Sequence, residues 1–156
     1  MSIVTLRNEI EAVINTISDC TYLRANENEA NKALNKIKVS ACLCIHSDRT
    51  DVTATRSQVG NYIYKEVPTE IYFVYKNTRI DDKQADVDIL VSQAELKADE
   101  FYDKIIQSAI INDMAELPGY TLTRLDAFKR FDAVLSGVLF KCDLHIHRNY
   151  YYCNGD

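Results

Sequence analysis

The stretch Val134-Leu-Ser-Gly-Val-Leu-Phe-Lys-Cys-Asp-Leu-His-Ile-His147 decides the fold that we expect for this chain. Every second side chain from Val134 to Ile146 is small or apolar. The intervening positions begin apolar and then become polar, in the order Leu135, Leu139, Lys141, Asp143, His145 and His147. Alternation with a period of two and one unbroken apolar face predicts a long β-strand that lies on a layer of helices.

The composition indicates one globular domain over residues 1–156, because a chain of this length can bury roughly two-thirds of its unfolded surface. The net charge is −5 and no run of basic residues occurs, so we expect no sequence-specific nucleic acid among its partners. No apolar run approaches the roughly 18 residues that a membrane span needs. The N-terminal residues lack the plan of a signal peptide. We therefore expect a cytoplasmic chain without a membrane partner.

Cysteine and tyrosine are the informative residue types. An odd number of cysteines without an export signal indicates free thiols in a reducing compartment rather than a disulfide framework. The cysteines are Cys20, Cys42, Cys44, Cys142 and Cys153. The ten tyrosines suggest many half-buried positions, in the core or between chains. Three adjacent ones form either an aromatic anchor on a partner or a loosely ordered terminus. They are Tyr150, Tyr151 and Tyr152.

The first part of the chain predicts two helical stretches and a strand. Apolar residues from Ile3 to Ile17 recur at three and four residues, which is typical of a helix. Residues 27–37 are a second helical stretch, after a polar break at 21–28. Residues 38–46 alternate as a strand. Its apolar face carries Val39, Ala41, Leu43 and Ile45, and its other face carries Ser40, Cys42, Cys44 and His46.

The polar segment 47–61 is expected to be a long loop or the tip of a protruding hairpin. Because it contains only two isolated valines, we expect it to serve assembly and to contribute little to folding. A second strand follows at 62–76. One side of it carries Ile63, Val67, Ile71, Phe73 and Tyr75. Pro68 cannot donate to a ladder and therefore marks an edge or a bulge.

The second half begins with residues 80–91, which are acidic and alternate, so we expect an extended connector. Ser92 and Glu95 have the spacing of a capping box, which predicts a helix over 93–115. Replacing Ser92 by Ala would then cost about 1 kcal/mol. Residues 120–132 fit a helix and a strand equally well, and the long closing strand follows.

Thiols and imidazoles on two strand faces raise the question of a metal site. Cys42, Cys44 and His46 share one face, and His145 and His147 share another, so a zinc site that bridges the strands is one hypothesis. The Cys-x2-4-Cys spacing of closed zinc sites is absent, and we therefore expect these five residues to bind no stoichiometric metal. No nucleophile motif, calcium loop or phosphate-binding glycine loop occurs, so we expect no catalytic residue and no cofactor.

The expected elements are a helix, a hairpin with a long polar tip, a capped helix and a closing strand that starts Leu135-Ser136-Gly137-Val138. This order resembles the tail-terminator family of tailed bacteriophages and its tail-completion and neck-ring relatives. The resemblance covers most of the chain, and the helical stretch at 27–37 departs from it. It implies an α+β fold, with helices packed on one face of a mixed or antiparallel sheet and a long protruding β-hairpin.

The resemblance also implies a non-enzymatic virion protein. Its subunits would form a homo-oligomeric ring, with a hexamer favoured, that ends the tail tube or joins it to neck or portal proteins. The expected interface residues are Asp48, Arg49, Asp51, Arg56, Lys141, Asp143, His145, His147, Tyr150, Tyr151 and Tyr152. Two other classes stay open. One is a small cytosolic α+β enzyme or metalloprotein that uses the two strand faces with cysteine and histidine, and the other is a dimeric binding module.

Overall fold

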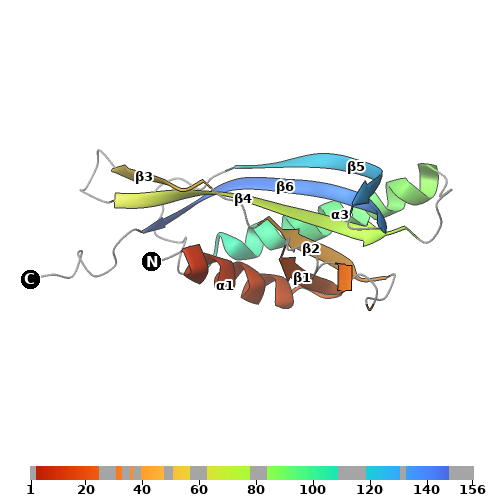
Figure 1. The fold of residues 1–156 in the computed structure, drawn as a ribbon, viewed down its shortest axis with the longest axis horizontal. Helices are drawn as coiled ribbons and strands as arrows, with labels where there is room; N and C mark the ends of the chain where they lie inside the picture. Colours follow the sequence, from red (N-terminus) through yellow and green to blue (C-terminus); the bar gives the residue numbers. More distant parts are fainter. Residues whose placement is uncertain are drawn as a thin grey trace, which may run out of the picture.

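A computed structural model gives the fold (Figure 1). It describes residues 3–24, 31–32, 36, 40–47, 51–56, 63–77, 84–108, 119–130 and 133–147. Within these residues, helices α1 (Ile3–Asn15) and α3 (Gln84–Ile105) cover one face of a six-stranded mixed sheet. The strands are β1 (Cys20–Arg24), β2 (Cys42–His46), β3 (Thr53–Arg56), β4 (Ile63–Lys76), β5 (Tyr120–Arg130) and β6 (Ala133–His147). The predicted α+β class is confirmed.

The sheet is built around the closing strand that the sequence predicts. Its order is β1-β2-β4-β6-β5, and β3 pairs with the outer part of β4. The β1–β2 pair is parallel and the other pairs are antiparallel. β6 pairs with β4 over thirteen residue pairs, from Tyr64 opposite His147 to Lys76 opposite Leu135. Figure 1 shows both strands running past the ends of the two helices.

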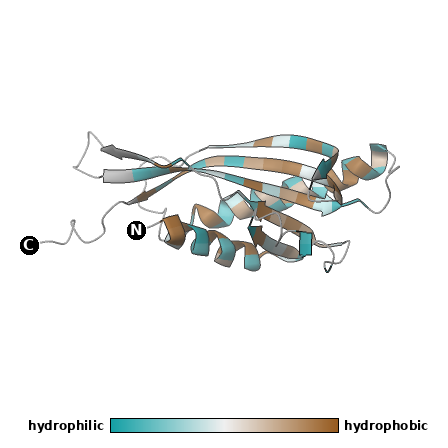
Figure 2. Ribbon diagram, viewed as in Figure 1, coloured by the Kyte–Doolittle hydropathy of each residue, from teal (hydrophilic) through white to brown (hydrophobic). Residues whose placement is uncertain are grey.

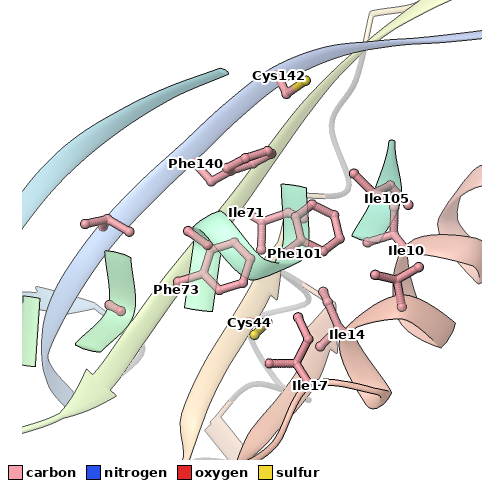
Figure 3. Packing of buried hydrophobic residues seen from close by; sticks show 14 of the residues in the cluster. Ile10, Ile14, Ile17, Cys44, Ile71, Phe73, Phe101, Ile105, Phe140 and Cys142 are labelled. Atoms are coloured by element: carbon pink, nitrogen blue, oxygen red, sulfur yellow. The ribbon is translucent and has the colours of Figure 1, made fainter. Parts of the chain in front are cut away.

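The apolar set of β6 faces the helices, as expected. Its members Val138, Phe140, Cys142, Leu144 and Ile146 are buried in the main core. At the centre, Phe73 of β4, Phe101 of α3 and Phe140 of β6 are fully buried (Figure 3), with ring centroids 5.7, 6.1 and 5.3 Å apart. Such aromatic pairs contribute about 0.5–1.5 kcal/mol each beyond their buried area. The three rings therefore join the helix layer to both long strands.

The strand β2 is shorter than predicted and is buried on both faces. It begins at Cys42 rather than at residue 38, and residues 40 and 41 belong to a turn and a bend. Cys42 and Cys44 face the helices, whereas Leu43 and Ile45 pack on the opposite face of the sheet. The long strands β4 and β6 have only one face on the main core, and Figure 2 shows hydrophobic and hydrophilic positions alternating along them.

The predicted polar break at 21–28 is wrong in its first part, because β1 occupies it. The strand follows the buried Ile17 and a turn at Asp19, whose φ is 56°. β1 has only five residues, and an alternation of polar and apolar residues over so short a stretch is too weak to predict a strand from the sequence. Of the helical stretch at 27–37, residues 31–32 are helical, and all others except residue 36 lie outside the described part.

The predicted extended connector is wrong over residues 84–91, and the predicted capping box at Ser92 is wrong; residues 80–83 lie outside the described part of the chain. α3 begins at Gln84, so Ser92 is an exposed residue inside the helix. Val87 and Val91 are four residues apart and buried, whereas Ile89 between them is 56% exposed. The apparent alternation is therefore the start of the helical stripe. That stripe consists of Val87, Val91, Ala94, Ala98, Phe101 and Ile105.

The ambiguous segment 120–132 contains strand β5, which carries a β-bulge. Opposite Ser136 of β6, β5 has two residues between Leu125 and Phe128, and Ala127 has a φ of 39°. The Ala127 N–H donates to Ser136 Oγ at 3.0 Å, and this hydroxyl donates to Asn77 Oδ1 at 2.7 Å. The serine thus satisfies a backbone group that the bulge removes from the ladder.

Part of the predicted loop 47–61 is strand β3, and Val52 packs against the main core. The expectation that this segment contributes little to folding stays a prediction. The connection at 57–62 lies outside the described residues, so the long protruding hairpin stays a prediction.

Pro68 lies at a local edge of the sheet, as expected. It is paired with Asp143 of β6 on one side. On the other side, β3 ends opposite Glu66 and β2 ends opposite Ile71. Ser47 N donates to Glu70 O at 3.0 Å, so the even-numbered residues of β4 direct their backbone groups to this side. The missing N–H of Pro68 therefore falls where no described strand residue needs it.

Gly137 is the position where β4 and β6 approach most tightly, and we expect Gly137→Ala to destabilise the protein by roughly 3 kcal/mol. A Cβ there would lie 2.0 Å from the Phe73 carbonyl oxygen and 2.8 Å from Val74 Cα, which are backbone atoms that cannot move aside alone. Gly119→Ala is the control, because nothing lies within 4 Å of its added Cβ. Thermal unfolding of both variants is the measurement, and equal midpoints would contradict the close approach.

The position of the α3 start is tested by a pair of alanine variants. Ser92→Ala should change the unfolding free energy by less than about 0.5 kcal/mol, because an exposed position inside a helix tolerates Ala. Val87→Ala should cost about 2 kcal/mol, from two lost methyl groups and a small cavity. A loss near 1 kcal/mol for Ser92→Ala with no effect of Val87→Ala would mean that the helix begins at Ser92 and not at Gln84.

Candidate functional site

The strongest concentration of chemistry in the described residues is a cluster of three thiols. The Sγ atoms of Cys20, Cys42 and Cys44 all lie within 4.8 Å of one another. Cys20 is half-buried, and the other two are 0% exposed. The sequence places Cys42 and Cys44 on one face of a strand, but nothing in its spacing indicates that Cys20 joins them.

The parallel pairing of β1 and β2 brings the third thiol to the other two. Cys20 is directly opposite Cys42 in the ladder, and Cys44 is two residues further along the same face. The turn before β1 fixes this register, because Cys42 N donates to Asp19 O at 2.8 Å. Backbone geometry therefore positions all three sulfur atoms.

Two lysines of helix α3 bind the turn between α1 and β1, which precedes Cys20. Lys97 Nζ donates to Ser18 O at 2.6 Å, and Lys104 Nζ donates to Thr16 O at 3.3 Å and Thr16 Oγ1 at 3.1 Å. These carbonyls follow the last turn of α1, where the helix dipole favours a cation. The turn that leads into Cys20 is consequently tied to both helices.

Hydrogen bonding within the cluster separates the acidities of the three thiols. The Cys42 and Cys44 thiols donate to the Cys20 sulfur and lower the pKa of Cys20 to about 4, and the charge of Lys97 acts in the same direction. Donation to Cys20 raises the pKa of Cys42, and burial raises the pKa of Cys44. Cys20 is therefore the most acidic of the three thiols, and Cys42 and Cys44 are less acidic than ordinary thiols.

The neighbours of the cluster are mainly apolar. Figure 3 shows Cys44 on the α1 side of the core near Ile14 and Ile17, while Cys142 lies at a different part of the same core. Burial raises the pKa of Tyr75, which interacts with Cys42. Burial likewise raises the pKa of Cys142 to about 12, so this thiol is protonated and unreactive.

His46 does not join the thiols, although the sequence places it on the same strand face. Its Nδ1 lies 2.8 Å from the Tyr22 hydroxyl, and its ring packs edge-on against that tyrosine. His46 also lines a small pocket of about 50 Å³ between α1 and the sheet. That volume holds one or two water molecules and is too small for an organic substrate.

The predicted bridge between the cysteine and histidine faces is not formed by the described residues. Cys44 is opposite Phe73 of β4, whereas His145 is opposite Glu66, seven residues away along the same strand. His147 continues β6 opposite Tyr64. The metalloprotein hypothesis in the form that unites these two strands therefore has no support from the geometry.

Several predicted interface residues gather on the outer face of the β4–β6 ladder. Lys141 and Asp143 are exposed, and His145 is half-buried. Lys141 Nζ lies 3.4 Å from Glu70 Oε1, and their side chains are 50% and 42% exposed. We call this surface the charged face. Its residues are Glu66, Glu70, Lys141, Asp143 and His145.

The other predicted interface residues are only partly described. Asp51 is exposed before β3, and the backbone of Arg56 pairs with Ile63. The remaining ones lie outside the described residues. They are Asp48, Arg49, Tyr150, Tyr151 and Tyr152.

Comparison with known proteins gives no family assignment: no family model matches the chain, and no curated protein is similar to it. Neither described helix combines the length and the apolar character that a membrane crossing requires.

The lowered pKa of Cys20 predicts selective alkylation of this thiol. At pH 6–8 it is already ionised, so its rate of reaction with iodoacetamide should be nearly constant, whereas an ordinary thiol gains about tenfold per pH unit below its pKa near 8.5. Peptide mapping by mass spectrometry assigns the rate to each cysteine, and Cys142 should stay unmodified in the folded protein. A tenfold rise per unit at Cys20 would mean that the cluster holds no thiolate.

Proposed function

We propose that this chain is a non-enzymatic structural subunit of a tailed-bacteriophage virion. It assembles as a homo-oligomeric ring, with a hexamer favoured, at the tail end or at the head–tail junction. There it terminates the tail tube or connects it to neck or portal proteins. Assembly takes place in the host cytoplasm, and the subunit remains in the virion.

The observation that carries this proposal is the long β4–β6 ladder, which runs past both helices at the end near β3 (Figure 1). The charged face lies on the outer side of this ladder. In the outer part of the ladder the backbone of β4 pairs with β3 on one side and with β6 on the other, which fixes the register of these strands. A strand pair of this kind offers a rigid surface to a neighbouring subunit. Its inner residue Ile146 is 1% exposed, which fixes the outward direction of the polar set.

The charges of this face suit contact between copies. Acidic Glu66, Glu70 and Asp143 lie beside basic Lys141 on two adjacent strands. A surface with both signs can pair with a different surface of the next copy, and such head-to-tail contacts close into rings when the rotation permits. Exposed charges also typify the rim of an interface, where they set register and specificity more than affinity.

The fold class adds support through the resemblance described above. Helices on one face of a sheet, a strand pair that extends beyond them and a closing strand with Leu135-Ser136-Gly137-Val138 agree with the expected subunit. These features favour a structural role over the small-enzyme alternative.

Particle mass and imaging test the ring. Light scattering on the purified full chain should give six times the 17.8 kDa mass of the monomer, and electron microscopy should show closed rings. A monomer or dimer at every concentration, alone and with phage tails, would contradict the proposal. A dimer alone would favour the binding-module alternative.

Exchange of an ion pair tests the charged face. In the double variant Glu70→Lys/Lys141→Glu, the pair within the subunit is kept while the pattern shown to a neighbour is inverted. Stability should change little, because exposed pairs contribute about 0–1 kcal/mol, and ring formation should fall at least tenfold. The control is Asp88→Arg/Arg124→Asp/Asp126→Asn, which inverts a similarly exposed pair between α3 and β5 and neutralises Asp126, the second partner of Arg124. Rings that form equally in both variants would exclude the charged face as the interface.

A further inference from the structure

The thiol cluster has the ligand number and the geometry of a metal site. Three sulfur atoms within 4.8 Å of one another converge from two adjacent strands. Around a zinc ion with Zn–S distances near 2.3 Å, thiolates are separated by about 3.8 Å. The sulfur atoms therefore need only a small rotation of their side chains to reach a common ion.

We propose that Cys20, Cys42 and Cys44 bind one Zn²⁺ ion as three thiolates. This site lies outside the charged face and does not depend on the proposed role in a virion. The sequence-based expectation of no metal concerned the spacing of Cys42 and Cys44 with three histidines, and it did not include Cys20. The third thiol supplies what that spacing lacks.

The chemistry of the donor set favours this class of ion. Thiolates are soft ligands that select Zn²⁺, Cu⁺ or iron–sulfur clusters over magnesium and calcium. Three thiolates and a divalent ion leave one negative charge, which the Lys97 ammonium beside Cys20 can balance. A monovalent ion would leave two negative charges in a largely apolar corner, and buried charge is costly.

The surroundings supply both access and rigidity. Cys20 lies on the edge strand β1 and is half-buried, so an ion can enter from its side without opening the core. Cys42 and Cys44 are fixed by the ladders on both sides of β2. With three protein ligands, the fourth position of the zinc ion is open to water.

Binding has a balanced proton account. All three cysteines bind zinc as thiolates, so every proton that these thiols carry in the metal-free protein passes to solvent when the Zn–S bonds form. No oxidation state changes. Because protons compete with the ion, affinity should rise with pH across the neutral range.

The experiment uses the full chain, purified without chelator and kept reduced. Elemental analysis should find about one zinc per chain. Titration of metal-free protein with Co²⁺ should give the intense near-ultraviolet absorption of thiolate-to-cobalt charge transfer, and added Zn²⁺ should abolish it. Zn²⁺ should also protect Cys20 from iodoacetamide and raise the thermal midpoint of unfolding.

Variants connect the ion to the cluster. Cys20→Ser replaces the half-buried ligand, so it should fold and lose at least nine-tenths of the bound zinc. Cys142→Ser is the matched control, because it alters a buried cysteine of the same core outside the cluster and should keep the full stoichiometry. Circular dichroism of both metal-free variants checks that they are folded.

Three results would overturn the proposal. One is a reduced wild-type protein that takes up no zinc and gives no cobalt charge-transfer band. Another is stoichiometric zinc that survives Cys20→Ser. The third is a disulfide between two cysteines of the cluster, detected as a loss of two hydrogens in the protein mass. If this disulfide re-forms after reduction in preference to zinc binding, the cluster is a redox pair.

Discussion

The antiparallel ladder between β4 and β6 is the constraint on which the rest of the structure depends. Its register places Phe73 beside Val138 and Ile71 beside Phe140, so one face of both strands is continuously apolar. A slip of one residue would turn this face toward solvent and the charged face toward the helices. The strand β2 adds to the free side of β4, and β5 adds to the free side of β6. Helix α3 then packs Phe101 against Phe73 of β4 and Phe140 of β6.

The thiol cluster lies away from the β4–β6 ladder, but the position of its cysteines depends on that ladder. β2 is held against β4 by the ladder and buried on both faces, which leaves Cys42 and Cys44 no freedom to turn outward. β1 then pairs in parallel and delivers Cys20 to them, while Lys97 and Lys104 fasten the preceding turn to α3. Small thiols can pack in a core as weakly polar hydrophobes. Three whose sulfur atoms lie within 4.8 Å of one another have in addition the character of a ligand set.

The charged face and the thiol cluster lie on opposite sides of the sheet and can serve different ends. The first is exposed, carries both signs and belongs to strands that extend past the helices, which suits contact with another subunit. The second is enclosed between the sheet and α1, where an ion would stabilise a short edge strand.

The sequence by itself determined the long strands and their faces. In β6 the alternation from Val138 to Ile146 is set by burial on one side and solvent on the other, and this pattern needs no knowledge of the neighbours. The α+β class, the inward set of β4 and the outward charges of β6 follow from it. The same reasoning weighed Cys42 and Cys44 only together with histidines, because nothing in the sequence places Cys20 in a neighbouring strand.

Only the tertiary structure decided the start of α3, the presence of β1 and the gathering of the thiols. At Ser92 a local capping motif competed with burial of Val87 and Val91, and burial against the sheet prevailed because it removes more apolar surface from water. β1 is five residues long and gains its stability from parallel pairing with β2, a contact between segments separated in the sequence. Cys20 reaches Cys42 and Cys44 through that same pairing, and contacts of this kind leave no periodic trace in a single chain.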